Sequence, residues 1–369
     1  MNFSFITGST KQKKLTKNNK IKHDLKLSSF RQHNLIFILL LIFVLLFFIL
    51  DLFLGSVSLN AADVVGALFS DKQGHLETIV YKFRLPKAIT ALVVGIGLSL
   101  SGLQMQTIFR NPMAGPDVLG ITSGASLGVA FVILGFSGNI SNTTLQGFGN
   151  WILVVSSWAG AGAIMIVILF IATRIKDIMT ILILGIMLSS GISALVILMQ
   201  YFSSESLLKA YVIWTMGSLG NLTASQLNVL IISVSAGILL SLASSKILNA
   251  LLLGENYAGS IGLNVKFARI IIFACTSILA GSVTAFCGPI GFIGIAVPHM
   301  ARILFRTSDH KILIPGTILL GGAVMLISDI ISQLPGSEKV LPLNAVTSLI
   351  GIPVVIWVVL RNRKYSGIY

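Results

Sequence analysis

The chain has 369 residues, of which 55% are hydrophobic and only 10% are charged, and its mean hydropathy is +0.93. This composition excludes a soluble domain with a polar surface and indicates a polytopic membrane protein. The net charge of +14 does not indicate nucleic acid binding, because the cations lie beside apolar runs and in an N-terminal tail, where they favour membrane topology and anionic lipid.

Ten stretches are apolar enough to cross a bilayer, and each crossing needs about 20 mostly apolar residues in a helix that bonds its own backbone amides. We therefore predict an all-α polytopic membrane protein. A basic cytoplasmic tail over residues 1–33 precedes a ten-span transmembrane domain over residues 34–364 and a short C-terminus over residues 365–369. The predicted spans are 34–55, 87–108, 116–136, 151–173, 179–200, 224–246, 267–287, 290–305, 311–332 and 342–361.

The distribution of cations predicts the orientation of these spans. If the tail faces the cytoplasm, most of the 26 Lys and Arg residues fall on the cytoplasmic side, as the positive-inside rule expects. Both termini are therefore predicted to be cytoplasmic, and the first span is expected to remain as an anchor because no convincing cleavage site follows it. Six cations fall on the outer side: Lys72, Lys82, Arg84, Lys87, Lys209 and Lys339.

The sequence Arg84-Leu85-Pro86-Lys87 places two of these cations at the outer end of the second span. Charge on this side runs against the topology rule, which suggests a use. Two interpretations remain open. The side chains either reach to lipid phosphates, or they form a basic patch that attracts an acidic external partner.

An inner turn from Arg110 to Gly120 follows the second span. Pro116 suits the first turn of a helix, and Asp117 complements the positive end of that helix. The spans on either side of the turn are rich in small residues, including the run 123–126. We expect these small residues to allow close helix packing rather than to contact a solute.

A polar stretch over residues 252–262 separates two apolar runs at the predicted cytoplasmic face. Its lone carboxylate, Glu255, lies between the glycine breaks Gly254 and Gly262. Three cations flank the stretch: Lys246, Lys266 and Arg269. The pattern predicts a short surface helix that serves as an attachment point for a cytosolic partner.

Three glycines and two prolines interrupt the stretch from Gly288 to Arg302, which therefore cannot form one regular helix. We expect a broken or re-entrant entry followed by a span that is kinked at Pro298. Irregular backbone at membrane depth is tolerated only against protein or a water-filled cavity, so the stretch predicts a transport pathway or a subunit contact. His299 is expected to be a hydrogen-bonded structural residue rather than a proton relay.

The sequence lacks an energy source of its own. It contains no Gly-Lys dipeptide and hence no GxxxxGK[ST] phosphate loop, so it cannot hydrolyse ATP by that route. Ion-coupled transport would need carboxylates or histidines deep in the membrane, whereas Asp51, Asp117, Asp177 and Asp329 fall near the ends of spans. The five histidines are too scattered for a metal cluster, and the two cysteines are expected to pack in the core.

In this order, the motifs resemble those of the FecCD family, the membrane permeases of ATP-driven importers for iron-siderophore complexes, haem and cobalamin. The resemblance runs from about Arg84 to Lys364 and rests on six blocks that are weak singly and specific together. The blocks are Arg84 to Lys87; Gln104 to Gly120 with Arg110-Asn111-Pro112; Trp214 to Leu219; Leu253-Gly254-Glu255 with Ala258 and Gly262; Gly288 to Arg302 with Pro298-His299; and Leu341-Pro342 with Gly351-Ile352-Pro353.

The resemblance implies a type II importer permease fold that dimerises with an identical or related permease around a central pathway. Two cytoplasmic ATPase subunits, which hold the ATP and the magnesium, would lie below the permease, and an extracytoplasmic substrate-binding protein would lie above it. The chain itself would bind no cofactor, perform no catalysis and reside in the cell membrane.

The resemblance also implies site residues. The polar stretch resembles a coupling helix, in which Glu255 takes a polar or basic contact on the ATPase and its neighbours supply packing. The implied residues are Leu253, Gly254, Glu255, Tyr257, Ala258 and Gly262 for ATPase coupling; Arg84, Lys87 and Lys339 for binding-protein docking; Asp177, Ile178, Met179, Thr180, Pro289 and Phe292 for the gate and pathway; and Pro298 and His299 for a structural kink.

The chain departs from the family at a second outer patch. Gln333 stands where relatives can carry an arginine after the aspartate at 329, and Val340 stands where an acidic residue is common. Lys339 is a candidate substitute for the missing arginine.

We expect a permease for ferric siderophores. A haem or cobalamin permease is the alternative within the family. An ion-coupled secondary transporter, which His299 and Asp329 would have to serve, is the alternative outside it.

Overall fold

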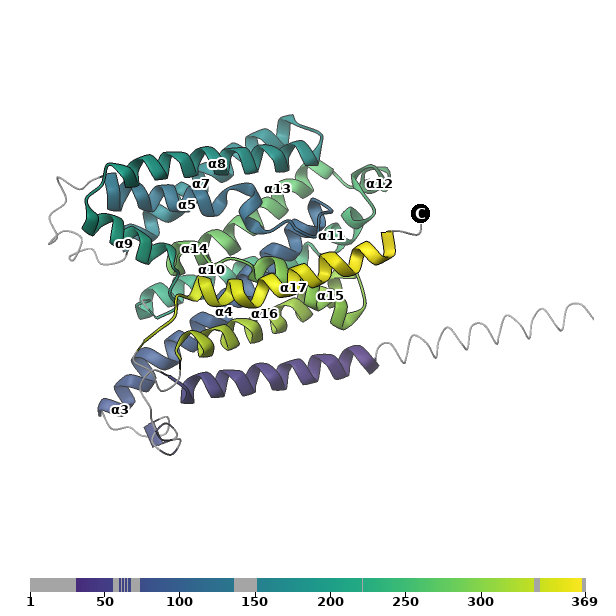
Figure 1. The fold of residues 1–369 in the computed structure, drawn as a ribbon. Helices are drawn as coiled ribbons and strands as arrows, with labels where there is room; N and C mark the ends of the chain where they lie inside the picture. The colour runs from purple at the N-terminus through teal and green to yellow at the C-terminus, as the bar shows by residue number, and fades with distance from the viewer. Residues whose placement is uncertain are drawn as a thin grey trace, which may run out of the picture.

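The computed structural model describes residues 31–55, 60, 62, 64, 66, 67, 74–135, 151–220, 222–334 and 339–366. Within these ranges the protein is all-α, and its long helices run side by side in a bundle (Figure 1). The basic tail up to residue 30 and residues 367–369 lie outside the described residues, so the structure does not test the predictions made for them.

The helices follow one another in chain order. They are an N-terminal helix (Arg31–Phe53), α3 (His75–Thr78), η1 (Ile79–Arg84), α4 (Leu85–Ile108), η2 (Pro116–Leu119), α5 (Ile121–Ala130), η3 (Phe131–Gly135), α7 (Trp151–Arg174), α8 (Ile178–Tyr201), α9 (Glu205–Thr215), α10 (Ala224–Ala243), α11 (Ser245–Leu252), α12 (Glu255–Ser260), α13 (Val265–Thr276), η4 (Ser277–Gly281), α14 (Ser282–Cys287), α15 (Ile293–Phe305), α16 (His310–Ser332) and α17 (Leu343–Ser366).

The described part of the chain contains the ten apolar helices that the sequence predicts. Seven are long enough to cross a membrane, and three are shorter: Ile121–Gly135, Ile293–Phe305 and Leu343–Trp357. The largest difference is in the second span, which begins at His75 rather than at residue 87, because α3, η1 and α4 form one continuous helix. The π-helical turn η1 directly precedes the α4 turn that contains Pro86, where an N–H donor is missing.

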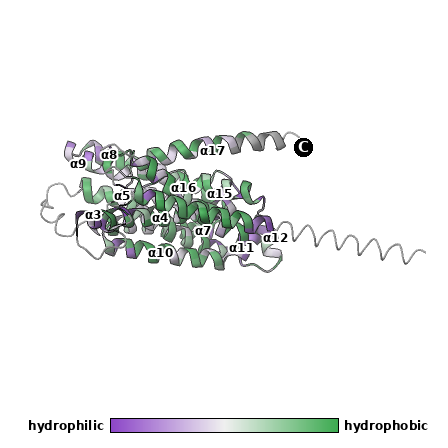
Figure 2. Cartoon of the chain, turned by 90° about the horizontal axis from the view of Figure 1, so that it is seen from below, coloured by the Kyte–Doolittle hydropathy of each residue, from purple (hydrophilic) through white to green (hydrophobic). Residues whose placement is uncertain are grey.

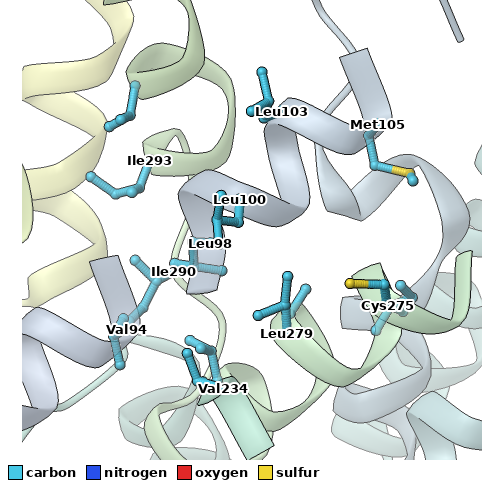
Figure 3. Packing of buried hydrophobic residues seen from close by; sticks show 14 of the residues in the cluster. Val94, Leu98, Leu100, Leu103, Met105, Val234, Cys275, Leu279, Ile290 and Ile293 are labelled. Atoms are coloured by element: carbon cyan, nitrogen blue, oxygen red, sulfur yellow. The ribbon is translucent and has the colours of Figure 1, made fainter. Parts of the chain in front are cut away.

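Helix α4 lies at the centre of the bundle and is the most buried of the long spans. Its glycines allow two neighbours to approach closely: a Cβ added at Gly95 would lie less than 3.0 Å from the Gly321 carbonyl oxygen of α16, and one at Gly102 would lie equally close to the Gly294 carbonyl oxygen of α15. The rest of α4 contacts a large apolar core, which Leu100 and Met105 of α4 share with Cys275 of α13 and Leu279 of η4 (Figure 3). The small residues before the inner turn therefore serve packing, as predicted.

The N-terminal helix lies at the edge of the bundle and is largely exposed (Figure 1). Near its first residues, the ring of His33 donates a hydrogen bond from Nε2 to the Phe305 carbonyl oxygen at 3.1 Å, and Phe37 contacts the Phe305 ring. Near its last residues, Asp51 is buried against α16. The helix is thus held at both ends. In its middle, Leu40 and Val44 pack in the core, and the other face has the apolar exposed surface expected towards lipid.

Polar residues gather at the two ends of the bundle, and apolar residues cover the middle (Figure 2). One end carries α11, α12 and the end of α17, and we call it the α12 end (Figure 1). The opposite end carries α3 and α9, and we call it the α3 end. This division is the one expected for a protein whose middle lies in a bilayer.

Candidate functional site

The polar stretch after α11 forms the short surface helix that the sequence predicts. Gly254 precedes α12 with φ 103°, and Gly262 follows it with φ 90°. Leu253 and Tyr257 are 63% and 50% exposed, whereas Ala258 is fully buried. Since glycine alone adopts these backbone angles without strain, the two glycines set the orientation of α12 and leave two large apolar side chains on the surface.

The Glu255 carboxylate does not point freely to a partner, which differs from the expectation. Arg269 of α13 donates from Nε to Glu255 Oε1 at 2.7 Å and from a terminal nitrogen to the other carboxylate oxygen. Sequence reasoning missed this pair, because it counted Arg269 as one of the flanking topology cations. The sequence showed only a lone carboxylate among three cations. Without the fold, this pattern does not show which cation pairs with Glu255.

The predicted gate residues lie at the beginning of α8. Asp177 is the N-cap: its carboxylate accepts hydrogen bonds from the Thr180 hydroxyl and from the backbone N–H groups of Thr180 and Met179. These bonds hold the pKa of Asp177 below its ordinary value. Ile178 is half-buried and Met179 is exposed. The carboxylate thus fixes the point at which the chain turns into α8.

A groove runs along α8 and has two hollows: one of about 520 Å³ between η2 and α8, and one of about 380 Å³ between α5, α8 and α9. Ser193 and Ile197 line both hollows. Hydroxyl groups provide most of the polar lining, and the Asp117 carboxylate lies in the larger hollow. The hydroxyl residues are Thr122, Ser123, Ser126, Ser189, Ser190, Ser193, Tyr211 and Thr215. Apart from Asp117, the lining consists of hydroxyl, amide and apolar groups, which can contact a polar solute without holding it by charge.

The sequence predicted packing for the small residues of α5, and this was correct for the glycines and for Ala125, which is fully buried in the core. A Cβ at Gly124 or Gly128 would lie less than 3.0 Å from backbone oxygens of α7. Ser123 and Ser126, in contrast, line the groove. Residues that pack against α7 and residues that line the groove therefore alternate along α5. The composition of the helix does not show which residue lies on which face.

The other predicted pathway residues lie apart from this groove. Pro289 and Phe292 belong to the connection between α14 and α15, and neither lines the two hollows. Here Gly288 has φ 75°, Phe292 has φ 66°, and the Gly291 amide donates to Asn344 Oδ1 at 3.0 Å. A Cβ at Gly351 of α17 would collide with Phe292. The break in this stretch was predicted correctly, and in the described structure it packs against protein.

Pro298 lies inside α15, and His299 is buried beside it. The His299 ring donates from Nε2 to the Pro112 carbonyl oxygen at 2.7 Å, with the tautomer assigned from this geometry. His299 therefore connects α15 to the turn between α4 and α5. This contact agrees with the structural role that the sequence indicated.

At the α3 end, the predicted docking cations are engaged within the chain. Arg84 is buried and donates to the Leu52 and Phe53 carbonyl oxygens at 2.8 and 3.0 Å. Lys87 forms a 3.0 Å ion pair with the buried Asp329, and its side chain remains 21% exposed. The picture of a freely exposed patch at Arg84 is therefore corrected, whereas Lys87 and the exposed Lys339 still reach the surface.

Gln333 joins the same cluster. Its amide nitrogen donates to Asp51 at 3.0 Å and to Asp329 at 2.9 Å. A neutral donor at this position satisfies two buried carboxylates at once, which gives a structural reason for the departure seen in the sequence. Among the described residues, no three His, Cys, Asp or Glu side chains come together as metal ligands.

Comparison with known proteins identifies a group of similar chains. A model of the FecCD transport family matches residues 40–361. The vitamin B12 import system permease protein BtuC of Escherichia coli O9:H4 (strain HS) is 34% identical over 288 residues, which cover 78% of this chain and 85% of that protein. The protein of the same name from Shigella boydii serotype 18 has the same identity and coverage.

Similarity also extends to a solved structure. This structure is described as an inward-facing conformation of an ABC transporter of the metal-chelate type. It matches with a TM-score of 0.76 at 28% identity and covers 89% of this chain and 99% of the other chain.

Proposed function

Because the chain belongs to the FecCD transport family, we propose that the importer of which it forms a part carries ferric siderophores. The chain is the permease of a type II ABC importer and has no catalytic activity of its own. The family assignment sets aside the ion-coupled secondary transporter that the sequence left open.

The groove along α8 supports the part of this proposal that concerns a pathway for a large polar cargo. Helix α8 borders the groove and leaves many side chains exposed on this side of the bundle. A second permease copy, identical or related, would cover this side and convert the groove into a channel. The cargo would pass between hydroxyl and aliphatic groups that bind it weakly, so that selection falls to the external binding protein.

The α12 end is proposed to face the cytoplasm and to contact the ATPase subunits. Leu253 and Tyr257 form an exposed apolar surface there, which Ile261 extends. Apolar side chains that are exposed among polar neighbours at a membrane surface mark a protein contact. The role assigned to Glu255 changes accordingly: it holds α12 in place through Arg269 and does not itself contact the ATPase.

The α3 end is proposed to receive the binding protein. Lys87 and Lys339 supply positive charge at this surface. Arg84 does not contact the binding protein in this proposal. It supports the surface by donating hydrogen bonds to the Leu52 and Phe53 carbonyl oxygens at the end of the N-terminal helix.

Cobalamin is the second candidate cargo. The names of the similar proteins from Escherichia coli and Shigella boydii favour it. Cobalamin and ferric siderophores are both metal chelates too large for a simple ion site, and a hydroxyl-lined groove suits either.

Uptake into proteoliposomes tests the proposal. The permease is reconstituted with its ATPase and binding protein, and radiolabelled ferric siderophore and cyanocobalamin are supplied in separate assays. We expect ATP-dependent uptake of the siderophore and little uptake of cyanocobalamin. The reverse result would assign the protein to cobalamin, and uptake that needs a proton gradient but no ATPase would overturn the importer assignment.

A further inference from the structure

We propose that Arg269 is a positioning residue that transmits movement of α12 to α8 and thereby to the groove. The proposal rests on the proposed function, in which the ATPase subunits contact α12. It concerns a residue to which the motifs of the sequence gave no role.

The Arg269 guanidinium lies between two elements that are distant in the sequence. On one side it holds both carboxylate oxygens of Glu255, the first residue of α12. On the other side it donates to the Ile175 carbonyl oxygen at 3.0 Å and to the Lys176 carbonyl oxygen. Every guanidinium nitrogen is therefore used, and the three elements α12, α13 and the α7–α8 turn meet at one side chain.

The burial of this side chain makes the link stiff. Arg269 is only 3% exposed, although it lies near the polar α12 end of the bundle. A planar fork that is fixed at two carboxylate oxygens and two carbonyl oxygens cannot shift relative to one partner without breaking contacts with the other. A lysine would keep the charge but could not make both pairs of contacts.

The α7–α8 turn, which Arg269 holds, leads directly into the first turn of α8. Lys176 is followed directly by Asp177, which caps α8 through its bonds to the next turn. Along α8, Ser189, Ser190 and Ser193 form one wall of the groove. A displacement of the turn therefore tilts or shifts the wall that faces the cargo.

The backbone around α12 permits such a displacement. Gly254 and Gly262 flank α12 with positive φ angles, and neither position is part of a helix. These glycines are natural pivots. Pivots at both ends leave the Glu255–Arg269 pair as a side-chain connection through which α12 can pull on the α7–α8 turn.

A labelling experiment on the complete importer tests the link. Lys176 has an exposed side chain at the turn, so K176C provides a reactive probe, and the two native cysteines are buried and contribute little background. The rate of labelling by a membrane-impermeant maleimide is measured with and without ATP plus vanadate, together with ATP hydrolysis and cargo uptake. All rates are compared within the K176C background.

We expect the labelling rate of K176C to change with nucleotide and this change to disappear in K176C/R269Q. ATP hydrolysis should persist in that variant, whereas uptake per ATP hydrolysed should fall by about tenfold, a size typical of coupling between sites. R269K should show a smaller loss in the same direction. It keeps the proposal testable if R269Q does not fold. K266Q, which removes an exposed cation three residues away on α13, is the matched control and should resemble the parent.

A charge exchange separates positioning from simple stability. E255R/R269E restores an ion pair, but a carboxylate at position 269 cannot donate to the carbonyl oxygens of the turn, so uptake per ATP should remain low. Recovery of coupling in this variant would overturn the proposal, as would a nucleotide response retained in R269Q or absent from K176C itself. If the parent complex shows no ATP-dependent uptake, it is the proposed function that fails.

Discussion

At the scale of single residues, the polar cluster at the α3 end illustrates how buried charge is stabilised in this protein. Asp51, Asp329 and Gln333 are all buried, and Lys87 supplies the positive charge in the 3.0 Å pair with Asp329. An ion pair of this kind adds little stability compared with an apolar replacement, but removing one partner leaves a buried charge uncompensated. The stability of the protein should therefore fall when one member of the ion pair is replaced, and should change less when both members are replaced by apolar residues.

The first prediction concerns this asymmetry. We expect K87M to lower the free energy of unfolding by roughly 3 kcal/mol, because Asp329 loses its counter-charge. The double variant K87M/D329L should recover most of that loss. Thermal unfolding of the purified protein in detergent measures both, with K266M as an exposed control. If the double variant were as unstable as K87M alone, the buried charge would not be the cause.

At the scale of elements, hydrophobic pattern predicted the helices well, because each span must satisfy its own backbone in the bilayer. The short helices α9 and α11 were not predicted as separate elements. Helix α9 lies outside the predicted spans. The predicted span 224–246 ends in the first turn of α11, and only a local turn near Ser244 separates α11 from α10. The continuous start of the second span at His75 was also missed, since proline normally marks a helix start and here the preceding π-turn overrides that preference.

The second prediction tests the orientation of α12. Gly254 has φ 103°, and a Cβ there would lie 3.2 Å from an Arg110 guanidinium nitrogen. We expect G254A to destabilise the local structure by about 1–2 kcal/mol and to weaken binding of the ATPase. Co-purification and hydrogen exchange of the α12 amides measure these effects.

The matched control lies five residues further along. Gly259 is inside α12, and a Cβ there meets nothing within 4 Å. G259A should leave ATPase binding unchanged and protect the amides slightly better, since alanine favours the helix. Equal behaviour of the two variants would mean that the backbone angle at Gly254 does not orient α12.

At the scale of the whole molecule, the candidate site could be predicted only in part from the sequence. The inner turn, the glycine-bounded helix and the kinked stretch were recognisable because glycine and proline have local consequences. The groove was not recognisable from the sequence. Its lining residues lie on one face each of α5, α8 and α9, and only the folded bundle brings these faces together. The Glu255–Arg269 pair was missed for the same reason: its meaning depends on the α7–α8 turn, more than 90 residues earlier in the chain.

The third prediction tests the groove as the pathway. Ser193 lines both hollows and is exposed, so S193W should fill the groove without disturbing the core. We expect cargo uptake to fall by at least about tenfold, because the indole would block the groove. ATP hydrolysis and the yield of purified protein should stay near the parent values, because the substitution affects coupling and not folding. Reconstituted uptake and hydrolysis are measured together.

I166W is the matched control for this variant. Ile166 is a strongly exposed residue of α7 that does not line either hollow. The same aromatic group at this position should leave uptake unchanged. A similar loss in both variants would point to a general effect of added bulk and would remove the groove from the pathway.

The bond between Gln333 and Asp51 has a consequence for the biosynthesis of the protein. These two residues are 282 positions apart, so at about 5–20 residues per second the ribosome supplies the amide roughly 14 to 56 seconds after the carboxyl group. During that interval the N-terminal helix is in the membrane with an acidic side chain that lacks this partner. A nascent chain that stops early would retain the defect, which a membrane quality-control protease could recognise as the mark of an incomplete product.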